Sequence, residues 1–107
     1  MRANVATLLL ALSAVPALCA GCARHATRAE CTAMLDKYID MEAGRADDVG
    51  RAPERERAAI VQTKKAQKKA EESYKKALAQ CEAEVRTSEL DCAMKAPSPE
   101  SWQACID

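Results

Sequence analysis

The 107-residue chain contains no phenylalanine, and its aromatic residues are limited to Tyr38, Tyr74 and Trp102. Much of its apolar content is alanine, which favours helices but contributes little buried area to a core. A chain this short also buries a smaller share of its surface on folding than a larger domain does. The fold therefore needs a source of stability other than the core.

Histidine and glycine are also scarce. The single histidine, His25, has no carboxylate or cysteine pair around it at metal-ligand spacing, so we expect a solvated linker residue. The sequence has neither a glycine-rich phosphate loop nor the Ser/His elements of acyl transfer. We therefore expect no metal, no cofactor and no enzymatic activity, because catalysis needs a pocket and a base.

The chain has no excess charge of either sign, since 16 Lys and Arg balance 16 Asp and Glu. The charges are spread unevenly. Positions 51–76 contain nine basic and four acidic residues, whereas positions 77–107 contain two basic and six acidic residues. A dedicated nucleic-acid binder is usually basic and often interleaves aromatic residues that stack on bases. We therefore expect no nucleic-acid partner.

The first residues carry one positive charge, at Arg2, and continue into an apolar run over residues 5–18. The run is too short to cross a bilayer as a helix, which takes about 20 residues. A charged start, a short apolar stretch and small residues at its end are typical of a secretory leader. We expect residues 1–21 to be a signal peptide that is removed on export.

The leader ends in Leu18-Cys19-Ala20-Gly21-Cys22, which resembles the lipobox of bacterial lipoproteins. Ala20, Gly21 and Cys22 match its last three positions, whereas Cys19 stands where leucine is usual and Leu18 lies one place early. The resemblance implies that Cys22 becomes the first residue of the mature protein and carries acyl chains such as palmitate. Two or more acyl chains bind a membrane far more firmly than one.

A lipidated Cys22 would make residues 22–28 a short tether between the membrane and the domain. The protein would then be anchored in the bacterial cell envelope, facing the periplasm or the cell surface. The alternative is ordinary cleavage, for example after Ala20, which gives a soluble periplasmic or secreted protein with an odd cysteine.

The number of cysteines favours the lipoprotein interpretation. Of six in the chain, Cys19 is lost with the leader and Cys22 is acylated, which leaves an even number to form two disulfides: Cys31, Cys81, Cys92 and Cys105. No closely spaced cysteine pair remains for a zinc site. Three pairings are possible, and Cys81 can reach either of the later cysteines. We favour a bridge from Cys31 to the C-terminal helices, because otherwise nothing ties in the first helix.

Residues 29–107 show helical patterns throughout and are expected to form one domain. Thr27 can cap a first helix over residues 28–43, with Glu30 in its first turn and Gly44 after its end. Its apolar residues recur every three or four positions and predict one buried stripe, formed by Cys31, Met34, Leu35, Tyr38 and Met41.

Residues 44–52 are expected to be a loop, and Pro53 to open a long helix that reaches about residue 86. No Gly or Pro interrupts this helix, whose apolar stripe is weak at first and becomes clear from Ala66 onwards. Such a helix is much longer than the first one. It must therefore bend or fray before Ile60, or project past its partners.

Two short helices complete the expected domain. Ser88 and Asp91 form a capping box for one of them, and Ser98 followed by Pro99 begins the other. Trp102 is expected to make the largest apolar contribution to the core. The predicted fold class is all-α: a small helical bundle or hairpin of three to four helices with one long central helix, braced by two disulfides.

Six lysines are the surface feature most suggestive of a partner: Lys64, Lys65, Lys68, Lys69, Lys75 and Lys76. They could contact anionic lipid, a glycolipid or another glycan, or an acidic face of an envelope protein, at about 1 kcal/mol for each lysine near an anionic surface. A solvated helix face is the simpler interpretation of the same pattern.

The four later cysteines, Glu84-Val85 and the run Cys92-Ala93-Met94-Lys95-Ala96-Pro97-Ser98 resemble small exported bacterial proteins with no assigned function. The resemblance covers most of the mature chain and implies no specific activity. We therefore expect a non-catalytic envelope lipoprotein, a structural or interaction domain at the membrane surface. The alternatives are a binding module that uses the lysines, and a soluble chaperone-like protein with an exposed apolar groove.

Overall fold

A computed structural model describes residues 24–107 of the chain, and these residues form helices with no strand element. The predicted all-α class with two disulfides is confirmed. The six helices of the described part are α1 (Arg28–Gly44), α2 (Asp47–Arg51), α3 (Glu54–Lys69), α4 (Glu72–Glu84), α5 (Thr87–Lys95) and α6 (Pro99–Ile106).

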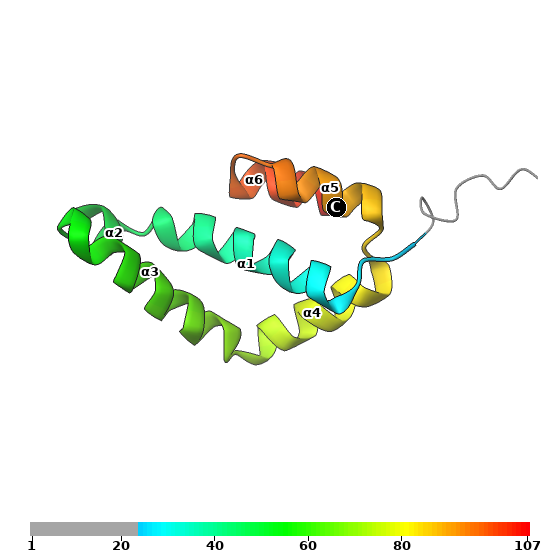
Figure 1. Cartoon of the computed structure of the whole chain (residues 1–107), viewed down its shortest axis with the longest axis horizontal. Helices are drawn as coiled ribbons and strands as arrows, with labels where there is room; N and C mark the ends of the chain where they lie inside the picture. The colour runs from blue at the N-terminus through cyan, green and yellow to red at the C-terminus, as the bar shows by residue number, and fades with distance from the viewer. Residues whose placement is uncertain (1–23) are drawn as a thin grey trace, which may run out of the picture.

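Helix α1 is the centre of the domain. In Figure 1 it lies between the α3–α4 pair on one side and the α5–α6 pair on the other, and it contacts all four helices. Its start agrees with the prediction: Thr27 accepts a hydrogen bond from the backbone N–H of Glu30, whose carboxylate accepts one from the backbone N–H of Thr27. This reciprocal pair satisfies two backbone donors that the helix leaves unpaired.

The structure divides the predicted long helix at Ala70 and Glu71, later than the position expected from the apolar pattern. The backbone of Glu71 is extended there and separates α3 from α4. A straight helix of both lengths would run far past α1, whereas the break lets α3 and α4 each contact α1. Sequence alone hides this break, since neither glycine nor proline marks it.

Two further local predictions were wrong. Residues 44–52 are not entirely a loop, because they contain the short helix α2. The cap of α5 is not the box of Ser88 and Asp91: Arg86 occupies that position without a side-chain cap, and the backbone N–H of Thr87 donates to the carbonyl of Arg24. Helix α2 and the break give six helices in the described residues where three to four were expected.

The start of the described chain is packed onto the domain. Within residues 24–27, expected to be tether, the backbone N–H of Ala26 donates to the carbonyl of Val85 across 2.8 Å, and the Ala26 side chain is buried. His25 is exposed, as expected, but its backbone pairs with that of Arg86. The domain therefore includes residues 24–27, while residues 1–23, which include Cys19 and Cys22, lie outside the described residues.

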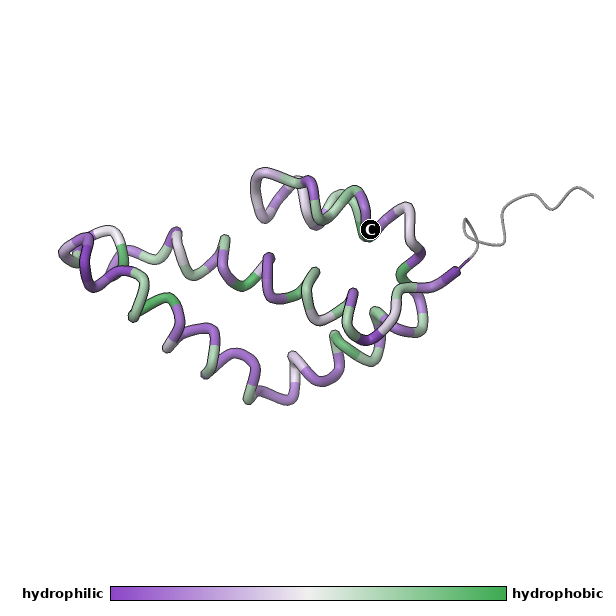
Figure 2. Tube along the Cα trace, viewed as in Figure 1, coloured by the Kyte–Doolittle hydropathy of each residue, from purple (hydrophilic) through white to green (hydrophobic). Residues whose placement is uncertain are grey.

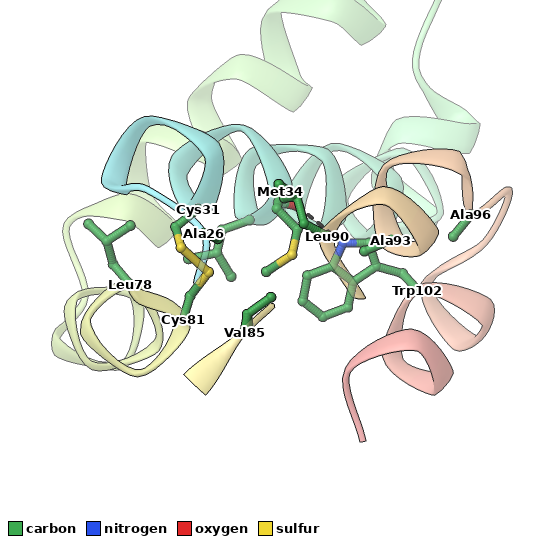
Figure 3. Packing of buried hydrophobic residues seen from close by; sticks show 11 residues of the cluster. Ala26, Cys31, Met34, Leu78, Cys81, Val85, Leu90, Ala93, Ala96 and Trp102 are labelled. Atoms are coloured by element: carbon green, nitrogen blue, oxygen red, sulfur yellow. Dashed lines mark hydrogen bonds between the residues drawn. A yellow bond between two sulfur atoms is a disulfide. The ribbon is translucent and has the colours of Figure 1, made fainter. Parts of the chain in front are cut away.

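The main core gathers around Met34 of α1, as Figure 3 shows. The indole N–H of Trp102 donates to the backbone carbonyl of Met34, which places the largest side chain of α6 in the centre. The fully or nearly buried members come from α1, α4, α5, α6 and the segments beside them: Ala26, Cys31, Met34, Leu35, Leu78, Cys81, Val85, Leu90, Ala93, Ala96 and Trp102. Neither α2 nor α3 contributes to this cluster.

The disulfides join Cys31 to Cys81 and Cys92 to Cys105. The expected bridge from Cys31 to the C-terminal helices was therefore wrong. The physical reason is that α5 and α6 lie against each other as a hairpin, which brings their own cysteines together, while the start of α1 lies beside α4. Helix α1 is tied to the C-terminal helices instead by Trp102 and by Arg45, whose guanidinium pairs with Glu100.

Candidate functional site

Helix α3 is attached to the domain mainly through charge. None of its residues is buried, and Figure 2 shows that it is hydrophilic along most of its length. It faces Asp36 and Asp40 of α1: Lys65 lies 3.1 Å from an Asp40 oxygen, and Lys69 lies 3.1 Å from an Asp36 oxygen. This helix is therefore the least firmly packed of the longer elements.

Asp36 is the centre of that contact. It accepts from Lys69 and from the hydroxyl of Tyr74, and a second lysine, Lys65, lies 3.8 Å away. The ammonium group of Lys69 also lies 5.7 Å from the centre of the Tyr74 ring. The hydrogen bond to Asp36 raises the pKa of Lys69, so this lysine is charged throughout the physiological range. The network fixes α3 and the start of α4 against α1.

The remaining lysines of the predicted set lie elsewhere. Lys64 pairs with Asp48 of α2 at 2.9 Å, Lys68 pairs with Glu71 at 3.2 Å, and Lys75 pairs with Glu72 at 2.8 Å. Lys76 is in none of the ion pairs formed between residues 24 and 107. The six lysines therefore do not form one surface, because Lys65 and Lys69 turn toward α1.

Lys64 and Lys68 line a hollow that was not predicted from the sequence and that we call the α1 groove. It has a volume of about 580 Å³, within the range of small-molecule sites. Its wall includes residues on both sides of the break between α3 and α4, together with residues of α1 and α6. Its wall consists of Leu35, Tyr38, Ile39, Glu42, Ala43, Ala46, Lys64, Lys68, Ser73, Tyr74, Ala77, Trp102 and Gln103.

The floor of the α1 groove is apolar and its rim is polar. Leu35 and Ile39 of α1 are buried, and the Trp102 ring lies 4.6 Å from the Tyr38 ring, centre to centre, at an interplanar angle of 41°. Gln103 donates to the Tyr38 hydroxyl at 2.9 Å. Burial raises the pKa of Tyr38, and the nearby Glu42 carboxylate acts in the same direction, so the hydroxyl stays neutral at pH 7.

A second hollow, of about 400 Å³, lies between α1, α4, α5 and α6 and has acidic residues in its wall, Glu84, Glu89 and Asp107. No three His, Cys, Asp or Glu side chains in residues 24–107 are grouped so that they could bind a metal ion. None of the helices in the same residues is both long enough and apolar enough to span a bilayer. Of the two hollows, the α1 groove has the larger apolar surface and the basic groups.

Comparison of the chain with protein-family models, with curated proteins and with solved structures finds no match. The function is therefore inferred from the chemistry of the described residues. The two disulfides indicate an oxidising, exported compartment, because structural disulfides are rare where cellular thiols are kept reduced. The signal for the groove was present in the sequence only as the loss of apolar residues between Val61 and Tyr74, apart from alanine.

Proposed function

We propose that the protein is a non-catalytic lipoprotein of the bacterial envelope, attached through an acylated Cys22 and acting by contact at the membrane surface. The observation that supports it is the cysteine pairing. The four cysteines within residues 24–107 form two disulfides with one another, so none of them needs Cys22 as a partner. A mature protein with Cys22 at its start would then have no unpaired thiol once this cysteine is acylated.

The packing of residues 24–27 supports a close attachment. Arg24 follows Cys22 by two positions, and its carbonyl accepts from the backbone N–H of Thr87 at the start of α5. An acyl anchor on Cys22 would therefore place the end of α4 and the start of α5 near the headgroups, without a long flexible tether. This favours a role at the bilayer surface over one that requires long reach.

Of the two alternatives from the sequence, a lysine-rich face for anionic lipid has less support. Five of the six lysines pair with carboxylates of the same chain, so an anionic surface would have to compete with them. A chaperone-like role through exposed apolar surface has little support outside the groove. The described residues contain one large exposed hydrophobic side chain, Met94.

The test of the proposed function is metabolic labelling with an alkyne fatty acid, in bacteria that express the wild-type chain, Cys22→Ser or Cys19→Ser. Label is expected on the wild type and on Cys19→Ser, both recovered with membranes, and absent from Cys22→Ser. Intact mass before and after reduction and alkylation should report acyl groups on Cys22 and four cysteines that react only after reduction. Label on Cys22→Ser, or a wild-type protein that begins at Gly21, would contradict the proposal.

A further inference from the structure

The Cys92–Cys105 bridge is the disulfide that a reagent in solution can reach. Cys31 and Cys81 lie inside the main core, where they are 0% and 3% exposed. Cys92 is exposed on α5, and Cys105 is half-buried near the end of α6. Thiol–disulfide exchange begins when a thiolate attacks one sulfur atom, so it requires access to that atom. Exchange in this domain is therefore expected at Cys92–Cys105.

The two sulfur atoms of this bridge have different surroundings. Cys92 is the more exposed of the two residues, so its sulfur is the one that an attacking thiolate meets first. The Sγ atom of Cys105 lies 3.3 Å from the carbonyl oxygen of Ser101, one turn earlier in α6. Once the bridge is open, the thiol of Cys105 can donate to this oxygen, because a cysteine S–H is a weak donor. The reduced Cys105 therefore has a hydrogen-bond partner at its present position.

Helix α6 is attached to the other helices mainly by residues that precede Cys105. Its hydrogen bonds to α1 and its ion pair with the residue after α1 come from Trp102, Gln103 and Glu100. Within residues 24–107, no hydrogen bond or ion pair joins α6 to α5. The last turn of α6 is held by the bridge and by the packing of Ile106 against the core. Opening the bridge should therefore free the last turn and leave the first turn in place, since local opening is easiest where few contacts remain.

We propose that the Cys92–Cys105 bridge is a redox switch, which a dithiol opens by attack on Cys92. A thiolate of the dithiol attacks the Cys92 sulfur, the bond between the two cysteines breaks, and Cys105 leaves as a thiolate that takes up a proton. The second thiolate of the dithiol then attacks the first sulfur of the dithiol and displaces Cys92, which is protonated in turn. The two cysteines gain two electrons and two protons, and the dithiol is oxidised to a disulfide.

The open and closed states of the switch differ at the second hollow. Ile106 and Asp107, which directly follow Cys105, belong to its wall, as does Trp102. When the last turn of α6 is released, the hollow loses the part of its wall that Ile106 and Asp107 form. Trp102 stays in place, because it is buried and its indole N–H donates to Met34. The switch therefore widens this hollow while the core remains folded.

This inference goes beyond the proposed function and does not depend on it. The bridge lies within residues 24–107 and needs no acyl group on Cys22. A protein without acyl groups on Cys22 would leave the switch intact, and a bridge that does not open would leave the lipoprotein proposal intact.

The first test identifies the sulfur that is attacked. The exported protein is treated with β-mercaptoethanol, an uncharged monothiol that forms the mixed disulfide and lacks the second thiol that would release it. N-ethylmaleimide then stops the reaction and labels the cysteine that was displaced. Peptide mass analysis should find most of the β-mercaptoethanol on Cys92 and most of the maleimide on Cys105. Cys31 and Cys81 should carry neither group, because both are buried.

The second test measures the consequence for α6 by NMR. Dithiothreitol, at a concentration that leaves Cys31–Cys81 closed by mass analysis, should move the methyl resonances of Ile106 toward their random-coil positions. The indole N–H resonance of Trp102 should stay close to its position in the oxidised protein, since its hydrogen bond to Met34 is kept. Reoxidation should return the Ile106 resonances to their original positions.

Two double variants separate this bridge from the buried one. Cys92→Ser with Cys105→Ser imitates the open switch without a reductant and should reproduce the Ile106 resonances of the reduced protein. Cys31→Ser with Cys81→Ser removes the bridge inside the core and should instead shift resonances of the core, including the Trp102 indole.

Three results would overturn the inference. A mixed disulfide divided equally between Cys92 and Cys105 would contradict attack at the exposed sulfur. Ile106 resonances that do not move on reduction would show that the bridge does not control the last turn. Loss of the folded Trp102 resonance, in the reduced protein or in Cys92→Ser with Cys105→Ser, would show that the bridge supports the whole domain and is not a switch.

Discussion

The indole Nε1–H of Trp102 donates a hydrogen bond to the backbone carbonyl of Met34 across 3.2 Å, from one end of the domain sequence to the other. This contact joins α6 to the middle of α1 in a core that otherwise consists largely of alanine, cysteine and medium-sized aliphatic side chains. Because few other large side chains are buried, the domain should depend on Trp102 more than a typical domain depends on one residue.

Substitution of Trp102 should therefore lower the free energy of unfolding, and by more when more of its buried side chain is removed. Trp102→Phe loses the hydrogen bond and some area and should lower the free energy of unfolding by about 1–2 kcal/mol. Trp102→Ala also creates a cavity and should lower it by about 3–5 kcal/mol. Urea unfolding followed by circular dichroism measures both. The neighbouring Gln103→Ala, at an exposed side chain, should cost less than either, and equal effects of all three would contradict this role of Trp102.

The helices could be predicted best where local chemistry decides them. Thr27 caps α1 as expected and forms a capping box with Glu30, and Ser98 accepts from the backbone N–H of Ser101 at the start of α6, directly before Pro99. Each of these signals acts over three residues of sequence, so no tertiary contact is needed to recognise it. The buried stripe of α1 was also correct at Cys31, Met34 and Leu35. Tyr38 and Met41 are only partly buried, and the buried Ile39 and Ala43 were missed.

The features that tertiary packing decides could not be predicted in the same way. The break at Glu71 follows from the need of α3 and α4 to stay beside the shorter α1, and the side chains at the break carry no signal for it. The partner of Cys31 depends on which helix lies beside it, and the sequence alone permits three pairings. The wall of the α1 groove includes residues on both sides of the break, so its shape depends on the same tertiary packing.

The two disulfides should differ sharply in their response to a reductant. Cys31 is 0% exposed and Cys81 is buried, whereas Cys92 is exposed at the surface of α5. Thiol–disulfide exchange requires access to a sulfur atom. Under native conditions dithiothreitol should therefore reduce Cys92–Cys105 first, and alkylation followed by peptide mass analysis should find label there before Cys31 or Cys81. Simultaneous labelling of all four cysteines would contradict the expected order.

The disulfides should also differ in the stability that they supply. Cys31–Cys81 closes 50 residues of chain and Cys92–Cys105 closes 13. The entropy of loop closure then gives about 4 kcal/mol for the first bridge and about 3 kcal/mol for the second. Two variants, each with both cysteines of one bridge replaced by alanine, should lose free energy of unfolding in that order, as measured by urea unfolding. The variant without Cys31–Cys81 should be the less stable, and the reverse order would show that local packing of α5 on α6 outweighs loop length.

Acid should weaken the contact between α1 and α6 in a defined range. Arg45 donates to both carboxylate oxygens of Glu100, at 2.6 and 3.0 Å, and lowers the pKa of Glu100 to about 2. A lowered folded-state pKa means that the unfolded chain binds the proton more readily. The contribution of Glu100 is therefore complete above the ordinary value of ~4.3 and is lost as the pH falls toward about 2.

Carboxyl chemical shifts followed by NMR give the direct measurement of the Glu100 pKa. Arg45→Gln should return this pKa toward ~4.3, the ordinary value for glutamate. Arg55→Gln, at a highly exposed arginine of α3, should leave it lowered. Because both Arg45 and Glu100 are exposed, 1 M salt should reduce the difference between wild type and Arg45→Gln. A Glu100 pKa near its ordinary value in the wild type would contradict the contact.

Helix α3 should open more readily than the other long helices, because ion pairs rather than buried side chains attach it to α1. Amide hydrogen exchange should be fastest in α3 among α1, α3 and α4, since local opening follows the number of buried apolar contacts. Asp36→Asn removes the charge that faces Lys65 and Lys69 and should speed exchange in α3 roughly two- to thirtyfold, at ~0.2–1 kcal/mol for each pair.

The control for this prediction is Glu72→Gln, which removes an exposed pair with Lys75 inside α4 and should leave exchange in α3 unchanged. The effect of Asp36→Asn should also stop short of α6, whose amides depend on Trp102 and on the Cys92–Cys105 bridge. Exchange in α3 as slow as in α1 would contradict attachment by charge.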